Sequence, residues 1–190
     1  MKKSFHAAWV IMLCATIITL GSCKKDDDLP ELPQPVVNEP EEITTVELHF
    51  TETASSAHIH ASWADTDGPG GADPVIESIT LDSGSTYNVE VLFLDESGDV
   101  AEDITAEIKE EDDDHIICFE PEGGLESILA ITRTDSDGTY EVGLESNWVA
   151  TNKASGELHL SLKHQPDGLK DGSCAPGETD IEVHFDITIQ

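Results

Sequence analysis

Apolar and polar residues alternate along most of the chain after residue 43, and this alternation constrains the fold more than any other feature of the sequence. Successive side chains of a β-strand point to opposite faces, so a period of two predicts strands with one buried face. Residues 86–96 become apolar on both faces at 91–94, which predicts a strand in the middle of a sheet. The clearest alternating segments are 43–52, 57–63, 156–164 and 180–189.

Shorter apolar segments and one helical pattern complete the predicted fold. About eight or nine short strands joined by turn residues predict an all-β domain, an antiparallel β-sandwich. Residues 102–114 break the alternation, because Ile104 and Ile108 are four positions apart and follow Asp103, a residue type that caps helices. We therefore expect one short helix there, with Asp103 as its N-cap. The other strand candidates are 74–81, 115–120, 127–134 and 147–151.

The N-terminus has the features of a lipoprotein signal peptide over residues 1–22. Lys2 and Lys3 precede an uncharged run, residues 7–20, that is too short to span a bilayer. The run ends in Leu-Gly-Ser before Cys23, which resembles the bacterial lipobox, whose cysteine is lipidated after cleavage. We expect Cys23 to anchor the protein to a membrane by its acyl chains. The alternative is an ordinary secretory signal followed by an unrelated cysteine.

The residues directly after Cys23 predict where the anchored protein is displayed. They resemble the surface-export signal of Bacteroidetes lipoproteins and comprise Lys24, Lys25, Asp26, Asp27 and Asp28. The alternative is a merely solvated tether. Residues 29–42 are rich in proline and read as an extended spacer, so 23–42 forms a lipidated tether and 43–190 a single domain.

The charge of the chain limits its partners. It has 9 basic and 40 acidic residues, a formal net charge of −31. Such a charge argues against binding nucleic acid or anionic membrane patches. It favours solubility and the binding of cations.

Several segments together resemble a known family. The segment EDIT, the acidic run before His115, the tripeptide His164-Gln165-Pro166 and the segment GETDIEV carry the resemblance best, with the lipobox and acidic leader before them. They resemble a family of short lipoproteins of Bacteroidetes and flavobacteria. Some members carry the label of type 1 periplasmic-binding-fold proteins, which are larger α/β proteins, whereas the alternation here predicts an all-β domain. The resemblance implies export and a small β-rich domain, and it implies no particular activity.

Histidines are the first candidate ligands. His58 and His60 share one strand face, and His115 and His164 lie next to acidic or strand-end positions. Neutral imidazole binds zinc or copper, and His115 and His164 could converge with an acid such as Asp114. The alternative is that exposed strand faces carry histidine as they carry other polar residues, as the outward positions of His49, His159 and His184 suggest.

Aspartates in two turns are candidate calcium ligands. Asp-x-Asp-Gly occurs twice and resembles the start of an oxygen-ligand loop. An EF-hand is excluded, because positions 76 and 146, where its bidentate glutamate would fall, are Ile and Ser. The alternative is that these residues only form turns. The candidates are Asp65, Asp67 and Asp73 in one loop and Asp135 and Asp137 in the other.

The predicted domain contains two cysteines. Cys118 and Cys174 are expected either as a disulfide, which an exported protein can keep, or as two free thiols.

The sequence has no G-x-S-x-G, H-E-x-x-H, Walker or G-x-G-x-x-G motif, so we do not expect the protein to be an enzyme.

These features predict a non-enzymatic, lipid-anchored module of the outer membrane that faces the cell exterior. It would bind a small ligand or a metal ion, zinc or copper, and could assist an outer-membrane transporter. One alternative is a structural or adhesive surface domain made rigid by calcium. Another is a hydrolase whose site follows no known motif.

Overall fold

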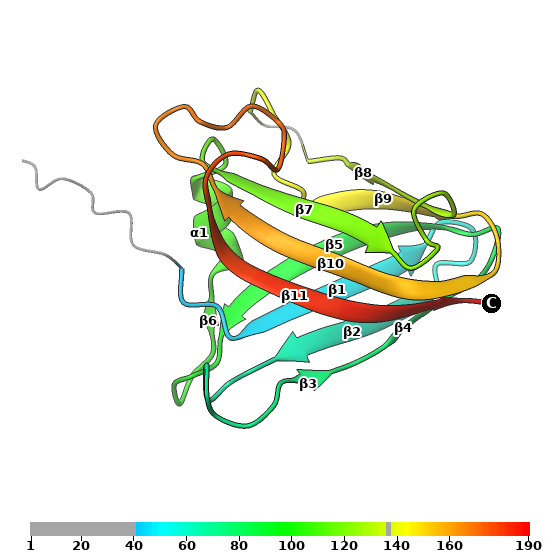
Figure 1. Cartoon of the computed structure of the whole chain (residues 1–190), viewed down its shortest axis with the longest axis horizontal. Helices are drawn as coiled ribbons and strands as arrows, with labels where there is room; N and C mark the ends of the chain where they lie inside the picture. Colours follow the sequence, from blue (N-terminus) through cyan, green and yellow to red (C-terminus); the bar gives the residue numbers. More distant parts are fainter. Residues whose placement is uncertain (1–40, 136–137) are drawn as a thin grey trace, which may run out of the picture. The chain divides into compact units, whose positions relative to one another are not determined.

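The computed structural model of the protein describes residues 41–135 and 138–190 and folds them into two β-sheets that pack against each other (Figure 1). The larger sheet contains β1 (Thr45–Glu52), β2 (His58–Ala64), β3 (Val75–Ile76), β5 (Thr86–Asp95), β6 (Glu102–Asp103), β8 (Leu129–Arg133) and β9 (Glu145–Ala150). The smaller sheet contains β4 (Ile79–Leu81), β7 (His115–Glu122), β10 (Ala154–His164) and β11 (Glu178–Ile189).

The strand orders show which strands are central. The larger sheet has the order β3-β2-β1-β5-β9-β8, with β6 paired to β5, and the smaller sheet has the order β4-β11-β10-β7. Neighbouring strands run antiparallel except β4 and β11, which run parallel. β5 lies between β1 and β9, in the central position that its apolar residues on both faces predicted.

The alternation of the sequence decides which side chains enter the core. On β5, Tyr87, Val89, Val91 and Phe93 are buried while Asn88 and Glu90 are exposed. On β10, every second residue from Leu158 to Leu162 is buried in the same way. The inward faces of both sheets thus form one apolar core. The predicted all-β sandwich with one short helix is confirmed.

The segment 74–81 differs from its prediction as one strand. It forms β3 and β4, which belong to different sheets. Val75 and Ile76 are exposed at the edge of the larger sheet, whereas Ile79 and Leu81 are buried beside β11. The apolar run predicts one strand, but the chain crosses between the sheets at residues 77–78. With β6, this raises the number of strands in the described residues above the eight or nine expected.

The helix α1 (Thr105–Glu110) is shorter than the predicted 102–114. Its N-cap is Ile104, not Asp103, although the Asp103 carboxylate accepts a hydrogen bond from the Thr105 backbone N–H at 3.0 Å. Ile104 and Ile108 are both buried, as their spacing predicted. In the described ranges, no helix is long and apolar enough to cross a membrane.

A long loop between β10 and β11, residues 165–177, lies at the same end of the domain as α1, and we call it the covering loop (Figure 1). Cys174 in this loop forms a disulfide with Cys118 on β7. The Gln165 side-chain amide donates to two backbone carbonyl oxygens farther along the loop, each at 2.9 Å. Lys170 donates to the backbone carbonyl of Asp112, just after α1. The loop is therefore fixed to β7 and to the segment after α1.

Removing the disulfide should destabilise the domain. The double variant Cys118→Ala, Cys174→Ala frees two residues that are 56 positions apart, and a loop of that size predicts a free energy of unfolding lower by about 2–4 kcal/mol. Urea denaturation of metal-free protein measures the change. Reductant should destabilise the wild type to a similar extent and leave the variant unaffected, and equal stability of the two proteins would contradict a structural role for the bond.

Candidate metal-binding site

His115 and His164 face each other in the interior at one end of the smaller sheet. His115 begins β7, His164 ends β10, and the two residues are directly opposite in the antiparallel register. Their rings stack with centroids 4.8 Å apart and an angle of 12° between planes. Only 1% of His115 and 9% of His164 is exposed. The alternation that places Leu158, Leu160 and Leu162 in the core also places His164 inward.

Asp180 joins the two histidines because of a bulge in the β10–β11 pairing. Leu162 faces Ile181 but Lys163 faces Thr179, so Asp180 is an extra residue on β11. An extra residue of this kind bends the strand and redirects side chains. The Asp180 side chain is only 2% exposed. One ligand atom from each of His115, His164 and Asp180 lies within 4.8 Å of the other two.

The geometry of His115 leaves one ring nitrogen available to a ligand. Its Nδ1 lies 3.2 Å from the backbone carbonyl oxygen of Glu111, which can only accept, so Nδ1 carries the proton. The neutral ring then has its lone pair on Nε2, which lies 3.9 Å from Asp180 Oδ2. That distance is too long for a hydrogen bond but close to the roughly 3.3 Å between two ligands of a tetrahedral ion. Metal-binding histidines commonly donate their other N–H to a carbonyl in this way.

The charges around the histidines favour a cation. Glu41 and Glu111 form a second group with His115 in which the ligand atoms are also within 4.8 Å of one another. Burial raises the pKa of the Glu41 carboxyl, and neighbouring carboxylates raise it further; these belong to Glu107, Glu111 and Asp180. A bound cation would relieve this repulsion between like charges.

Burial also shifts the pKa values of the ligands themselves. It raises the pKa of Asp180, against the opposing effects of His164 and Lys163. It lowers the pKa of His115, which keeps the imidazole neutral near pH 7. A neutral imidazole is the form that binds a metal, and an ion beside Asp180 would favour its charged form.

Three oxygen atoms at this end of the domain are buried without a hydrogen-bond partner among the described residues. They are Asp180 Oδ2, Glu111 Oε2 and Gln165 Oε1. An unsatisfied buried acceptor costs about 1–3 kcal/mol, and more if it is charged. An ion between Asp180 and the histidines would satisfy the first of these atoms.

Gly177 brings the end of the covering loop close to His164. Its φ angle is +84°, a conformation that glycine adopts without steric cost. A Cβ atom at this position would lie 2.1 Å from the His164 carbonyl oxygen. No other residue type fits this approach, which places β11 and Asp180 beside the end of β10.

The structure places the other predicted ligands differently. Asp114 does not join the site through its side chain; its backbone carbonyl accepts a hydrogen bond from Gln165 N at 2.6 Å. His58 and His60 share a strand face, but His58 Nδ1 is 3.1 Å from Thr51 Oγ1. His60 instead faces His49 on β1. In the described part of the chain, no group of three ligand atoms contains His58.

The first predicted calcium loop does not gather its aspartates. Asp65 Oδ1 is buried without a hydrogen-bond partner among the described residues, and Asp67 Oδ2 accepts a hydrogen bond from Ala72 N at 2.9 Å. Asp73 is exposed. Within residues 41–135 and 138–190, no group of three ligand atoms within 4.8 Å of one another includes these aspartates.

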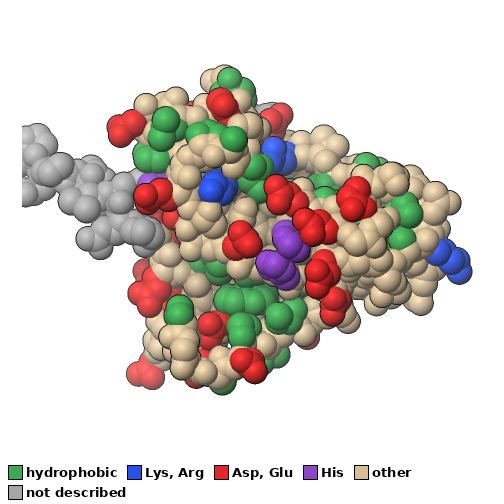
Figure 2. Space-filling view, in the orientation of Figure 1, with side chains coloured by type: hydrophobic (Ala, Val, Ile, Leu, Met, Phe, Trp, Pro, Cys, Tyr) green, Lys and Arg blue, Asp and Glu red, His purple; other side chains and the backbone are tan. Residues whose placement is uncertain are grey.

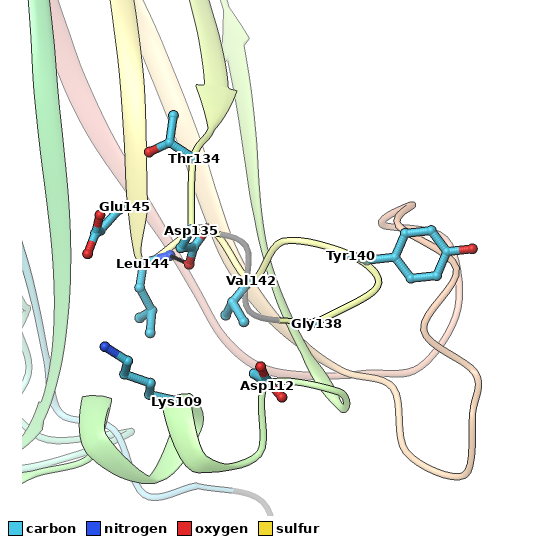
Figure 3. Close-up of a pocket in the computed structure, with 9 residues that line it drawn as sticks. All are labelled: Lys109, Asp112, Thr134, Asp135, Gly138, Tyr140, Val142, Leu144 and Glu145. Carbon is cyan, nitrogen blue, oxygen red and sulfur yellow. Dashed lines mark hydrogen bonds between the residues drawn. The ribbon is translucent and has the colours of Figure 1, made fainter.

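Asp135, from the second predicted calcium loop, lines an open cavity of about 350 Å³ near α1 (Figure 3). Both of its carboxylate oxygens accept hydrogen bonds from Gly143 N, at 2.8 and 2.9 Å, and one also accepts from Leu144 N at 2.7 Å. The carboxylate therefore closes the turn after β8, which was the alternative to calcium binding. Asp137 lies outside the described residues, as do Cys23 and the predicted export signal from Lys24 to Asp28.

Sequence reasoning missed Asp180, Glu41 and Glu111 as members of the site. The alternation placed Asp180 on the outer face, because Ile181 was assigned to the inner face and no signal marked the bulge. Glu111 belongs to the acidic run before His115. The sequence draws attention to this run, but nothing in it indicates which of its acidic residues lies beside His115. Glu41 lies in the predicted spacer, so nothing in the sequence linked it to the histidines.

Comparisons with protein-family models, with curated proteins and with solved structures find no match to this chain. Function is therefore inferred from the chemistry of the site.

Replacing Asp180 should reveal the cost of its burial. We expect Asp180→Asn to raise the free energy of unfolding of the metal-free protein at pH 7 by about 1–3 kcal/mol, because a buried carboxylate with one unsatisfied oxygen is removed. The raised pKa of Asp180 means that the native state takes up its proton first, so stability falls as pH rises through this pKa. The gain should therefore shrink at acidic pH, where Asp180 is protonated.

Urea denaturation across this pH range measures the effect. Asp186→Asn, on an exposed position of the same strand, is the matched control and should change little. A loss of stability in Asp180→Asn at pH 7 would mean that the carboxylate is already well paired without an ion.

Proposed function

We propose that this protein is a lipid-anchored, non-enzymatic module of the outer membrane that captures a transition-metal ion at His115, His164 and Asp180. It would face the cell exterior and could pass its ion to an outer-membrane transporter. The family resemblance, the lipobox and the acidic leader support the location.

One observation carries the proposal: two buried histidines and a buried carboxylate converge, and the carboxylate has an oxygen without a hydrogen-bond partner among the described residues. A purely structural polar cluster would be expected to satisfy its buried atoms internally, because that is how native proteins avoid the desolvation cost. An ion explains both the 3.9 Å separation of His115 Nε2 from Asp180 and the unsatisfied oxygen.

The donor set selects the class of ion. Two imidazoles and one carboxylate are borderline nitrogen and oxygen ligands, which suit zinc or copper(II) and suit calcium or magnesium poorly. With three protein ligands, a fourth position remains for water. Where the Asp180 carboxyl is protonated, binding would release its proton, because a carboxylate ligand binds in its deprotonated form.

Zinc titration tests the site directly. We expect metal-free protein to bind one zinc ion at this site with a dissociation constant below about 1 μM in isothermal titration calorimetry. His115→Gln, His164→Gln should abolish this binding event, because glutamine keeps a polar side chain but cannot replace the imidazole ligands. Circular dichroism and thermal melting check that the variant remains folded.

His58→Gln is the matched control, since His58 is outside every three-ligand group found in the described residues. It should bind zinc as the wild type does. Unchanged tight binding in the double variant, or none in the wild type, would exclude the buried site as a metal centre.

The predicted lipid anchor and surface display are tested separately from metal binding. Intact mass spectrometry of the protein extracted from membranes should show a chain that begins at an acylated Cys23. Protease added to intact cells should digest the domain, and replacing Asp26, Asp27 and Asp28 with alanine should protect it. An unmodified Cys23, or a protein recovered in the soluble fraction, would contradict lipid anchoring without bearing on metal binding.

A further inference from the structure

Six of the seven histidines in the described residues lie directly opposite another histidine on a neighbouring strand. One of the three pairs is the buried pair described above. The other two lie on outward-facing positions, one pair on each sheet: His49 with His60, and His159 with His184. Directly opposite residues have Cβ atoms only about 4.5–5.5 Å apart, close enough for both rings to reach one ion.

On the larger sheet, the two rings share one carboxylate oxygen. The ring centroids of His49 and His60 are 4.8 Å apart. Glu47 Oε2 is 2.9 Å from His49 Nε2 and 3.6 Å from His60 Nε2, so three ligand atoms converge on one point. A second carboxylate, that of Glu77, lies 3.4 Å from His60 Nδ1 and can orient this ring.

The smaller sheet repeats the arrangement on its own outer face. The ring centroids of His159 and His184 are 3.8 Å apart. Glu157 forms a three-ligand group with them, and its Oε2 lies 3.9 Å from His159 Nε2. Figure 2 shows histidine side chains in contact on this face, with acidic side chains around them.

The two clusters share one arrangement of ligand atoms. In each, two imidazole rings from neighbouring strands and one glutamate carboxylate place a ligand atom within 4.8 Å of the other two. Imidazole and carboxylate together are the ligand types that zinc and copper(II) accept. A divalent ion would join both rings to the carboxylate.

We propose that Glu47, His49 and His60 form one further site for zinc or copper(II), and that Glu157, His159 and His184 form another. Both are separate from the buried site and do not depend on it. Their ligands are partly exposed, whereas those of the buried site are covered. These sites should therefore bind more weakly and exchange their ions more readily, as suits uptake from solution.

The test is a zinc titration of the purified full-length protein in excess Mg²⁺, which occupies sites made only of carboxylates. The wild type should bind three zinc ions, two of them more weakly than the third. His49→Gln and His184→Gln should each remove one of the weaker events, and the double variant should remove both. NMR signals of the histidine rings should shift on zinc addition for His49 and His60 in His184→Gln, and for His159 and His184 in His49→Gln.

His58→Gln is again the matched control, because His58 lies on the same strand face as His60 but pairs with Thr51. It should retain all three events. Weaker binding that survives the His49→Gln, His184→Gln double variant, or ring signals that do not shift, would overturn the inference. If the His115→Gln, His164→Gln double variant loses only the tight binding event, that event belongs to the buried site. If the wild type shows no tight binding event, the proposed function is refuted, but the inference about the two outer sites is unaffected.

Discussion

The antiparallel register of the strands is the constraint on which every candidate ligand group with two histidines depends. Imidazoles can share an ion only if the register sets them opposite each other, and a slip of one residue would turn each side chain to the other face of its sheet. The same strands carry the apolar residues of the core, so the register is held by packing: Leu158, Leu160 and Leu162 of β10 are fully buried between the sheets. His159 and His164 keep their positions because these leucines keep theirs. Core packing and ligand geometry are thus one constraint in this fold.

The sequence predicts a strand pairing well only when the paired residues are close together in the chain. The strands themselves were predictable, because a period of two is a local pattern. The pairing of His49 with His60 was also within reach, since β1 and β2 are neighbours in sequence and the short loop of residues 53–57 joins them as a hairpin. The pairing of His159 with His184 spans the covering loop, and that of His115 with His164 spans several strands, so no local pattern could give either register. Asp180 was beyond prediction because it is itself the extra residue on β11, between the partners of Leu162 and Lys163, and this bulge reverses the face that the alternation implies.

The buried site is placed where a sandwich can accept polar groups. His115 and His164 lie at the ends of their strands, where the apolar core stops and the covering loop begins. Burying a carboxylate there costs stability, and the raised pKa of Asp180 reflects this cost. An ion that binds only the native state would offset the cost and add stability as its concentration rises above the dissociation constant. A group that destabilises the metal-free fold but stabilises the loaded one is what a binding function predicts, whereas a purely structural role would favour an apolar residue at this position.

The disulfide fixes part of the proposed buried site independently of any ion. Cys118 lies on β7 three residues after His115, and Cys174 lies in the covering loop six residues before Asp180. The bond therefore links the strand that carries one ligand to the loop that leads to another, and Gly177 completes the approach to His164. Since the disulfide already orders the covering loop, ion binding at the proposed site would lose little conformational entropy through ordering this loop. The large negative charge attracts cations to the whole surface, but it cannot distinguish between them. If the proposed sites bind zinc or copper, their selection over the more abundant hard cations would come from the opposed imidazoles, which the strand register sets in place before an ion binds.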